Sequence, residues 1–314
     1  NMIERKVLSE EYLQATVLDH IRINEDDLRD IFLRFNTTLR ASHLYAADKK
    51  TADSLWNLLE SGESFEKLAF ETFQDPHLKN NGGDLGEFQT DEMDIAFENA
   101  AHLLKVGDYS KPVRTSQGYS IIKLTDRYVR PVITEFEYAN QKANLTRFVR
   151  RRKQELATRS HLAAITENFE INQDQVESLW NWVGENRGLF ESNDAELLRA
   201  APGDNEVILT FENYKFSLRD FYQETYFTPG LSRTRIRSRS QFNDYVKGLA
   251  YRAFAVEQAK SMGMHEQEMV KGSINQTFYV YLQNRSVDYL RDQIEITEDE
   301  IREAFFENPA QYVT

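Results

Sequence analysis

The sequence predicts an α+β protein in which one small mixed domain is flanked by mainly helical segments. Apolar residues recur at three- and four-residue steps over 4–36, which is the spacing of an amphipathic helix face. The stretches 135–182 and 240–290 also indicate helices, whereas 109–124 indicates two short strands joined by a turn. Helices and strands mixed over roughly 90 residues favour a compact α+β domain.

The composition of the chain excludes or disfavours several classes of function. A length of 314 residues suggests about two domains, and 40% hydrophobic residues can form a sizeable core. The 38 basic residues are outnumbered by 51 acidic ones, and a net charge of −13 disfavours a general nucleic-acid binder. No apolar run approaches the roughly 18 residues of a membrane helix. The chain has no cysteine, which excludes thiol catalysis and cysteine-based zinc sites.

The first half of the chain alternates between helical and extended patterns. Asn24 is a good N-cap, and Asp26 and Asp27 in the following turn suit the positive end of a helix. The stretch 40–46 shifts to an extended pattern, and a loop rich in turn-forming residues occupies 75–84. The other elements expected here are helices at 51–60, 64–72 and 91–104, and strands at 109–113 and 119–124 around a turn at Gln117-Gly118.

The second half is mainly helical, with a short hairpin expected around Glu212-Asn213 and a helix break at Pro229-Gly230. The boundaries that we expect are a helical tail at 1–38, a mixed domain at 39–130, a mainly helical module at 131–293 with a hairpin near 206–217, and the start of a repeated module at 294–314.

The repeat relates 21–32 to 294–305, where six of twelve positions are identical. Two amphipathic helices with the same capping chemistry would explain part of this match. The matched strings are longer than a cap requires, so we favour a module that begins again. This interpretation predicts a further small α+β domain beyond Thr314.

Five ordered motifs carry a resemblance to a known family. They are Ala41-Ser42-His43-Leu44, the helix start at 62–69, the Gly82-Gly83-Asp84-Leu85-Gly86-Glu87-Phe88 string, the pair Met93 and Phe97, and Gly118-Tyr119-Ser120-Ile121-Ile122-Lys123-Leu124. In order and spacing, 39–127 resembles the parvulin-type peptidyl-prolyl cis-trans isomerases. The flanking segments are similar in organisation to the helical chaperone modules of SurA- and PrsA-type extracytoplasmic foldases.

The resemblance implies a four-stranded antiparallel sheet with surrounding helices, and it implies roles for individual residues. His43 matches the first active-site histidine of the family, and Asp75 lies where the family carries Cys or Asp beside the proline pocket. Ser120 replaces the second histidine, so activity could be reduced or altered. The residues implied to bind substrate are Leu85, Phe88, Met93, Phe97 and Gln117. From the residues alone, Met93 and Phe97 could equally be core neighbours on one helix face, His43 a core histidine and Asp75 a turn residue.

The chemistry of such a site is undemanding. Rotation about a peptide bond faces a barrier of roughly 18–20 kcal/mol because the C–N bond has partial double-bond character. No bond is broken, so the reaction requires no nucleophile, metal or cofactor. An apolar pocket that holds the proline ring and polar groups that favour the twisted amide are sufficient.

We therefore expect an isomerase and chaperone that acts on unfolded or nascent polypeptides with X-Pro bonds. The alternatives are a non-catalytic peptide-binding chaperone that retains the fold, and a scaffold protein built from repeats. The resemblance implies the bacterial periplasm or another extracytoplasmic site. Proximity to a membrane would come through a signal peptide, lipoprotein anchor or other segment outside this sequence. No nucleic-acid partner is expected.

Two basic stretches remain to be explained. One is Arg147, Arg150, Arg151, Arg152, Lys153 and Arg159, and the other is Arg233, Arg235, Arg237 and Arg239. In a chain with a net charge of −13, we interpret the first as a solvated helix face rather than a contact for RNA. We interpret the second as an exposed loop. The six histidines show no metal-ligand spacing.

Overall fold

The structure is a computed structural model that describes residues 2–192, 196, 206–294 and 297–307. The chain forms two compact units. The sheet unit comprises Val17–His161, and the helical unit comprises Asn1–Thr16 with Leu162–Thr314. The expected tail at 1–38 is shared between the units, whereas 39–130 lies within the sheet unit. A compact unit is defined by contacts in space and need not coincide with a domain of the sequence. The expected domain boundaries therefore stay a prediction.

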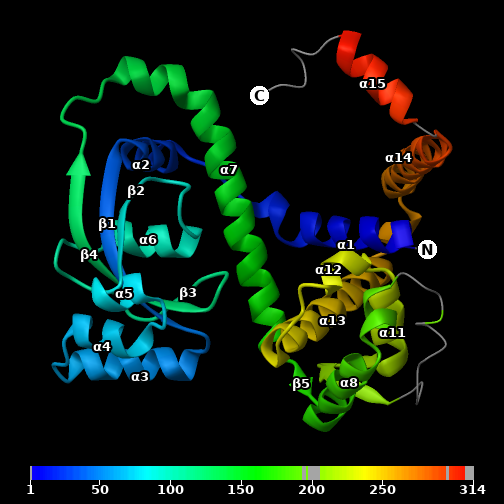
Figure 1. The fold of residues 1–314 in the computed structure, drawn as a ribbon, viewed down its shortest axis with the longest axis horizontal. Helices are drawn as coiled ribbons and strands as arrows, with labels where there is room; N and C mark the ends of the chain where they lie inside the picture. The colour runs from blue at the N-terminus through cyan, green and yellow to red at the C-terminus, as the bar shows by residue number, and fades with distance from the viewer. Residues whose placement is uncertain (1, 193–195, 197–205, 295–296, 308–314) are drawn as a thin grey trace. The chain divides into compact units, whose positions relative to one another are not determined.

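The sheet unit contains one four-stranded sheet in the order β2-β1-β4-β3, with every neighbouring pair antiparallel (Figure 1). This confirms the predicted α+β fold. The elements in chain order are η1 (Leu18–His20), α2 (Glu25–Phe35), β1 (Thr37–Ala46), α3 (Lys49–Glu60), α4 (Phe65–Thr72), α5 (Pro76–Asn80), β2 (Asp84–Phe88), α6 (Ile95–Leu103), β3 (Val113–Arg114), β4 (Tyr119–Val129) and α7 (Glu135–Thr166).

The longest strand pairing joins β1 to β4 and runs from Thr37 opposite Val129 to Ala46 opposite Tyr119. A β-bulge interrupts it, because Arg40 pairs with Asp126 and Ala41 with Leu124. Successive side chains of a strand point to opposite faces of the sheet. The register therefore decides which residues share each face.

Helices cover both faces of this sheet. One face buries Leu44 and Ile121 against α3 and α4, in a cluster that includes Leu59, Phe65 and Leu68. The opposite face packs against α6 through a second cluster, which contains Leu39, Ala41, Phe88, Phe97, Ala101, Ile122 and Leu124. The candidate site lies on this second face.

Helix α2 begins as predicted. Asn24 accepts a hydrogen bond from the Asp27 amide, and the Asp27 carboxylate accepts one from the Asn24 amide, both at 2.9 Å. The buried face of α2 packs on the first half of α7, and the residues in this cluster are Leu28, Ile31, Phe32, Tyr138, Leu145 and Val149.

The helical unit contains one large core and a three-stranded sheet in the order β5-β6-β7. Strands β6 and β7 form an antiparallel hairpin in the region where the sequence suggested one. The elements are α1 (Met2–Thr16), β5 (Glu170–Ile171), α8 (Gln173–Glu185), α9 (Arg187–Glu191), β6 (Val207–Phe211), β7 (Tyr214–Ser217), α11 (Leu218–Tyr226), α12 (Gly230–Arg233), α13 (Arg239–Ser261), η2 (Met264–Glu266), α14 (Glu268–Asp292) and α15 (Glu298–Glu307).

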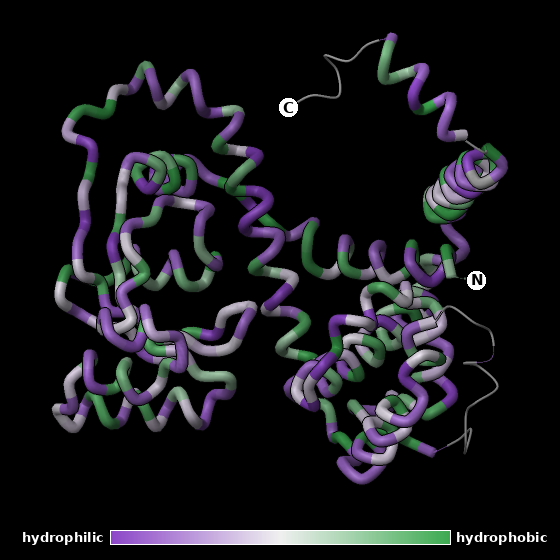
Figure 2. Tube along the Cα trace, in the orientation of Figure 1, coloured by the Kyte–Doolittle hydropathy of each residue, from purple (hydrophilic) through white to green (hydrophobic). Residues whose placement is uncertain are grey.

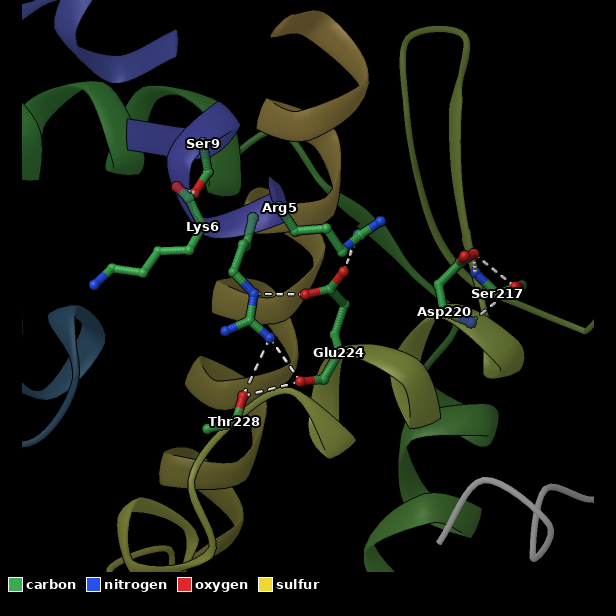
Figure 3. Close-up of polar contacts among 8 residues, drawn as sticks. Arg5, Lys6, Ser9, Ser217, Asp220, Glu224 and Thr228 are labelled. Carbon is green, nitrogen blue, oxygen red and sulfur yellow. Dashed lines mark hydrogen bonds and ion pairs between the residues drawn. The ribbon is translucent and has the colours of Figure 1, made fainter. Parts of the chain in front are cut away.

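A buried carboxylate ties three helices of this unit together. Glu224 of α11 is 1% exposed and forms ion pairs with Arg5 of α1 and Arg252 of α13. Arg252 also donates to the Glu224 carbonyl at 2.6 Å and to the Thr228 hydroxyl at 3.1 Å (Figure 3). Arg5 and Glu224 are 219 positions apart, so this ion pair joins the N-terminal helix to elements far along the chain.

The interpretation of Arg233 as part of an exposed loop is wrong. Its side chain is buried, and its guanidinium donates to the backbone carbonyls of Phe190 and Ser192. These carbonyls lie at the end of α9 and just beyond it, where helix C-termini leave unpaired acceptors.

Helix α15 repeats the capping chemistry of α2. Thr297 and Glu300 exchange hydrogen bonds between side chain and backbone, as Asn24 and Asp27 do. The residues that correspond to buried Leu28 and Phe32 are Ile301 and Phe305, and both are exposed. The shared cap accounts for part of the repeat. Residues 308–314 lie outside the described residues, so the repeated module stays a prediction.

No helix among the described residues is long and apolar enough to cross a lipid bilayer. Figure 2 shows hydrophobic and hydrophilic segments alternating along helices such as α1 and α2.

The approach of the glycine-rich turn to β1 gives a first prediction. Gly83 has a φ of +73°, and a Cβ there would lie 2.3 Å from the His43 carbonyl oxygen. We expect Gly83→Ala to lower the free energy of unfolding by about 3 kcal/mol or more, because left-handed strain is added to a backbone clash. Urea denaturation measures this. The matched control is Gly62→Ala, which has a φ of +98° in open space and should cost about 1 kcal/mol. Equal losses would contradict the clash.

The Glu224 ion pairs give a second prediction. We expect Glu224→Ala to lower the free energy of unfolding by about 3 kcal/mol, because two arginines lose a buried partner. Glu257→Ala, on the exposed side of α13, should change it by less than about 0.5 kcal/mol. Thermal or urea unfolding of the two variants tests the difference, and similar small effects would show that Glu224 is dispensable.

Candidate functional site

The candidate site is an apolar surface beside His43 on the α6-covered face of the sheet. The His43 ring lies 5.2 Å from the Phe73 ring and 6.1 Å from the Phe97 ring, centroid to centroid. Phe97 in turn contacts Phe88 edge-to-face at 5.9 Å. Aromatic rings thus surround the imidazole on two sides.

The structure brings together the four apolar residues that the family resemblance implies to bind substrate. Phe88 and Phe97 are buried and form the floor of the site, while Leu85 and Met93 pack against the same cluster but are only half-buried. Buried aromatic residues alone would describe an ordinary core. The two partly accessible side chains at its edge are what a surface needs in order to contact a ligand. Their role in binding remains a prediction.

The imidazole ring of His43 is neutral near pH 7. Both ring nitrogens are buried, and neither has a hydrogen-bond partner among the described residues. Burial lowers the pKa of His43 from 6.5 to about 4. Buried polar atoms are nearly always satisfied in folded proteins, so the two nitrogens of this ring are an exception.

Ser120 lies on the same face as His43. In the β1–β4 register His43 is opposite Ile122, two residues beyond Ser120, and the Ser120 side chain is buried. Residues diagonal to each other across neighbouring strands lie within reach of long side chains.

The glycine-rich string positions the start of β2 beside His43. The His43 amide donates to the Gly83 carbonyl at 2.9 Å, and only glycine can approach so closely with a positive φ. Asp84 follows and pairs with Arg40 at 2.6 Å, which lowers the pKa of its carboxyl group. Leu85 is thereby fixed at the edge of the apolar surface.

Asp75 and Gln117 are both exposed. The Asp75 carboxylate caps α5 and accepts hydrogen bonds from the amides of His77 and Leu78, each at 3.0 Å. The Gln117 carbonyl accepts a hydrogen bond from the Tyr45 hydroxyl at 2.9 Å. The turn role that the sequence allowed for Asp75 is therefore present. A contact of either residue with substrate remains a prediction.

Glu98 is a part of the site that the sequence analysis missed. It lies one position after Phe97 in α6 and is 1% exposed. One carboxylate oxygen accepts hydrogen bonds from the backbone amides of Asp91 and Met93, at 2.7 and 3.1 Å. The other accepts from Arg152 at 2.6 Å. The sequence did carry one indication of a buried acid: Glu98 lies three positions before Ala101, on the apolar side of a short helix.

Among the described residues, no group of three or more His, Asp or Glu side chains is placed to hold a metal ion.

Residues 31–126 match the PPIC-type PPIase domain family, described as rotamase. The chain is homologous to foldases named PrsA, and it spans about half the length of the curated relatives it matches.

Three of these similarities show the extent of the match. PrsA of Geobacillus sp. (strain WCH70) is 40% identical over 124 residues, which is 40% of this chain and 45% of that protein. PrsA of Caldanaerobacter subterraneus subsp. tengcongensis is 34% identical over 175 residues, 53% of this chain and 56% of that protein. The crystal structure of PrsA from Bacillus cereus is 35% identical and covers 47% of this chain and 52% of that one, with a TM-score of 0.32.

The lowered pKa of His43 gives a pH prediction. Between pH 6.5 and 4 the unfolded chain binds a proton at His43 that the folded chain does not, so stability falls as the pH falls. From pH 7 to pH 5 this loss is about 2 kcal/mol. We expect His43→Leu to lose less stability over this range than the unaltered protein, by that amount.

Urea denaturation at the two pH values measures the difference. Burial also lowers the pKa of His102 to about 4, but His102 is present in both proteins and its contribution cancels. Exposed His20→Gln is the control and should behave like the unaltered protein. Identical pH dependence in His43→Leu would contradict the prediction.

Proposed function

We propose that this chain is a peptidyl-prolyl cis-trans isomerase that acts on X-Pro bonds of unfolded polypeptides. The observation that carries the proposal is the combination at His43. A buried, unpartnered imidazole lies beside an apolar floor whose edge, formed by Leu85 and Met93, is partly accessible. The match of residues 31–126 to the PPIC-type PPIase domain supports the same activity.

The apolar residues would act by holding the proline ring. The barrier of roughly 18–20 kcal/mol comes from amide resonance, which is lost when the bond is twisted. A ring fixed against Phe97 and Met93 leaves the residue before proline free to rotate. Interactions that strengthen in the twisted state lower the barrier, whereas those equal in both states improve only binding.

The polar contribution would come from His43 and Ser120. Because His43 is neutral near pH 7, its ring can donate one hydrogen bond and accept another, once a bound peptide displaces the side chains that bury its nitrogens. A twisted amide nitrogen is pyramidal and gains a lone pair, so a donor beside it stabilises the transition state. Ser120 offers a second donor and acceptor on the same face.

The clients would be unfolded extracytoplasmic proteins. The named foldases among the relatives favour this class of substrate, although the chain covers only part of their length. Helix α14 adds support, because it exposes consecutive apolar and aromatic side chains that could contact an unfolded segment: Phe278, Tyr279, Val280, Tyr281 and Leu282.

A protease-coupled assay on an Ala-Pro peptide tests the proposal. We expect the chain to accelerate isomerisation, and Met93→Ala to lower kcat/KM about tenfold because an apolar contact with the proline ring is removed. Met262→Ala removes an exposed methionine of the helical unit and should leave the rate unchanged.

A rate equal to the uncatalysed one would remove the proposed activity. If the same protein still suppressed aggregation of an unfolded client, the chain would instead be a non-catalytic peptide-binding chaperone.

A further inference from the structure

The basic stretch of α7 contacts the loop that carries Met93. The interpretation of this stretch as a solvated helix face is wrong for Arg152, which is buried. Three arginines of α7 pair with acids of the site region: Arg151 with Asp91 at 2.7 Å, Arg152 with Glu98 at 2.6 Å, and Arg159 with Asp94 at 2.9 Å. All three lie beyond residues 31–126, so α7 supplies contacts that the matched rotamase domain does not contain.

The central pair holds the loop by its backbone. Glu98 accepts hydrogen bonds from the amides of Asp91 and Met93 with one oxygen, and from Arg152 with the other. A buried carboxylate is stable only when its charge is paired and its oxygens are occupied. Arg152 therefore allows Glu98 to remain in place as an acceptor directly beneath Met93.

The loop contains a residue in the left-handed region of backbone space. Asp91 has a φ of +80°, which is unusual for a residue with a side chain. Its amide is fixed by Glu98 and its carboxylate by Arg151. Strained backbone persists where the surroundings over-determine it, and it clusters at binding sites.

A second loop is held by the same helix. The Asp94 oxygen that pairs with Arg159 also accepts a hydrogen bond from the Ser116 amide at 3.0 Å. Ser116 lies in the turn that leads into β4 and Ser120. The arginines of α7 thus support both loops that flank the apolar surface.

We propose that Glu98 is a positioning residue for substrate binding, with its charge paired by Arg152 of α7, and that its acceptor oxygen for the Asp91 and Met93 amides sets the affinity of the site for the proline ring. The proposal rests on the proposed function, because it requires Met93 to contact that ring. Met93 contacts the ring in the ground state and in the transition state alike. A loosened loop therefore raises KM more than it lowers kcat.

The experiment compares two double variants of the full chain. Glu98→Leu with Arg152→Met removes the acceptor, and Glu98→Gln with Arg152→Met keeps an oxygen for the two amides. In both double variants the substituted side chains carry no charge, so no buried charge is left unpaired. We therefore expect both variants to fold. We expect the first to raise KM for an Ala-Pro peptide about tenfold with kcat changed less than about threefold, and the second to stay within about threefold in both constants.

Arg150→Met is the control for the arginine substitution, because Arg150 is exposed on the same helix. Its KM should equal that of the unaltered chain. An unchanged KM in both double variants, even with a lowered Tm, would overturn the proposal and leave the pair a structural contact only. An equal rise in both would also overturn it, because the acceptor oxygen would then not matter.

The dissociation constant for the same peptide, measured by titration, separates this inference from the proposed activity. If the unaltered chain binds the peptide without accelerating isomerisation, the proposed activity fails, and the Kd of the two double variants still tests the positioning role. If the unaltered chain does not bind the peptide, both proposals fail.

Discussion

The antiparallel pairing of β1 with β4 is the constraint on which the site depends. Side chains alternate between the faces of a strand, so one register places His43 and Ser120 on the side of α6 and any one-residue slip would reverse it. The bulge at Arg40 and Ala41 adjusts the pairing without moving these residues to the other face. The glycine-rich turn then lies against the His43 backbone, where no side chain would fit.

A site that breaks no bond depends on shape more than on reactive groups. Its apolar floor is formed by buried residues of β2 and α6, and these are fixed by the core. Its edge is formed by loop residues, which a core does not fix. The ion pairs of Glu98 and Asp94 with arginines of α7 supply the missing restraint. They account for two of the arginines on this helix, in a chain whose net charge is negative.

A local sequence pattern predicted the Asn24 cap, which depends on residues close together in the chain. The family resemblance, and not a local pattern, predicted the four-stranded sheet and the set Leu85, Phe88, Met93 and Phe97, which the structure groups together. The Glu98–Arg152 pair could not be predicted in this way, because its partners are 54 positions apart and come from separate helices. Arg233 was misjudged for the same reason, since its acceptors lie more than 40 residues away.

The unpaired ring of His43 has a consequence for stability. Both of its nitrogens are buried and have no hydrogen-bond partner among the described residues, and the resulting cost in stability grows as the pH falls. The Met93 loop, by contrast, is held by paired contacts, because Glu98 accepts a hydrogen bond from the Met93 amide and Arg152 pairs with Glu98. The α6-covered face thus combines a polar group that the fold leaves unsatisfied with a loop that the fold restrains.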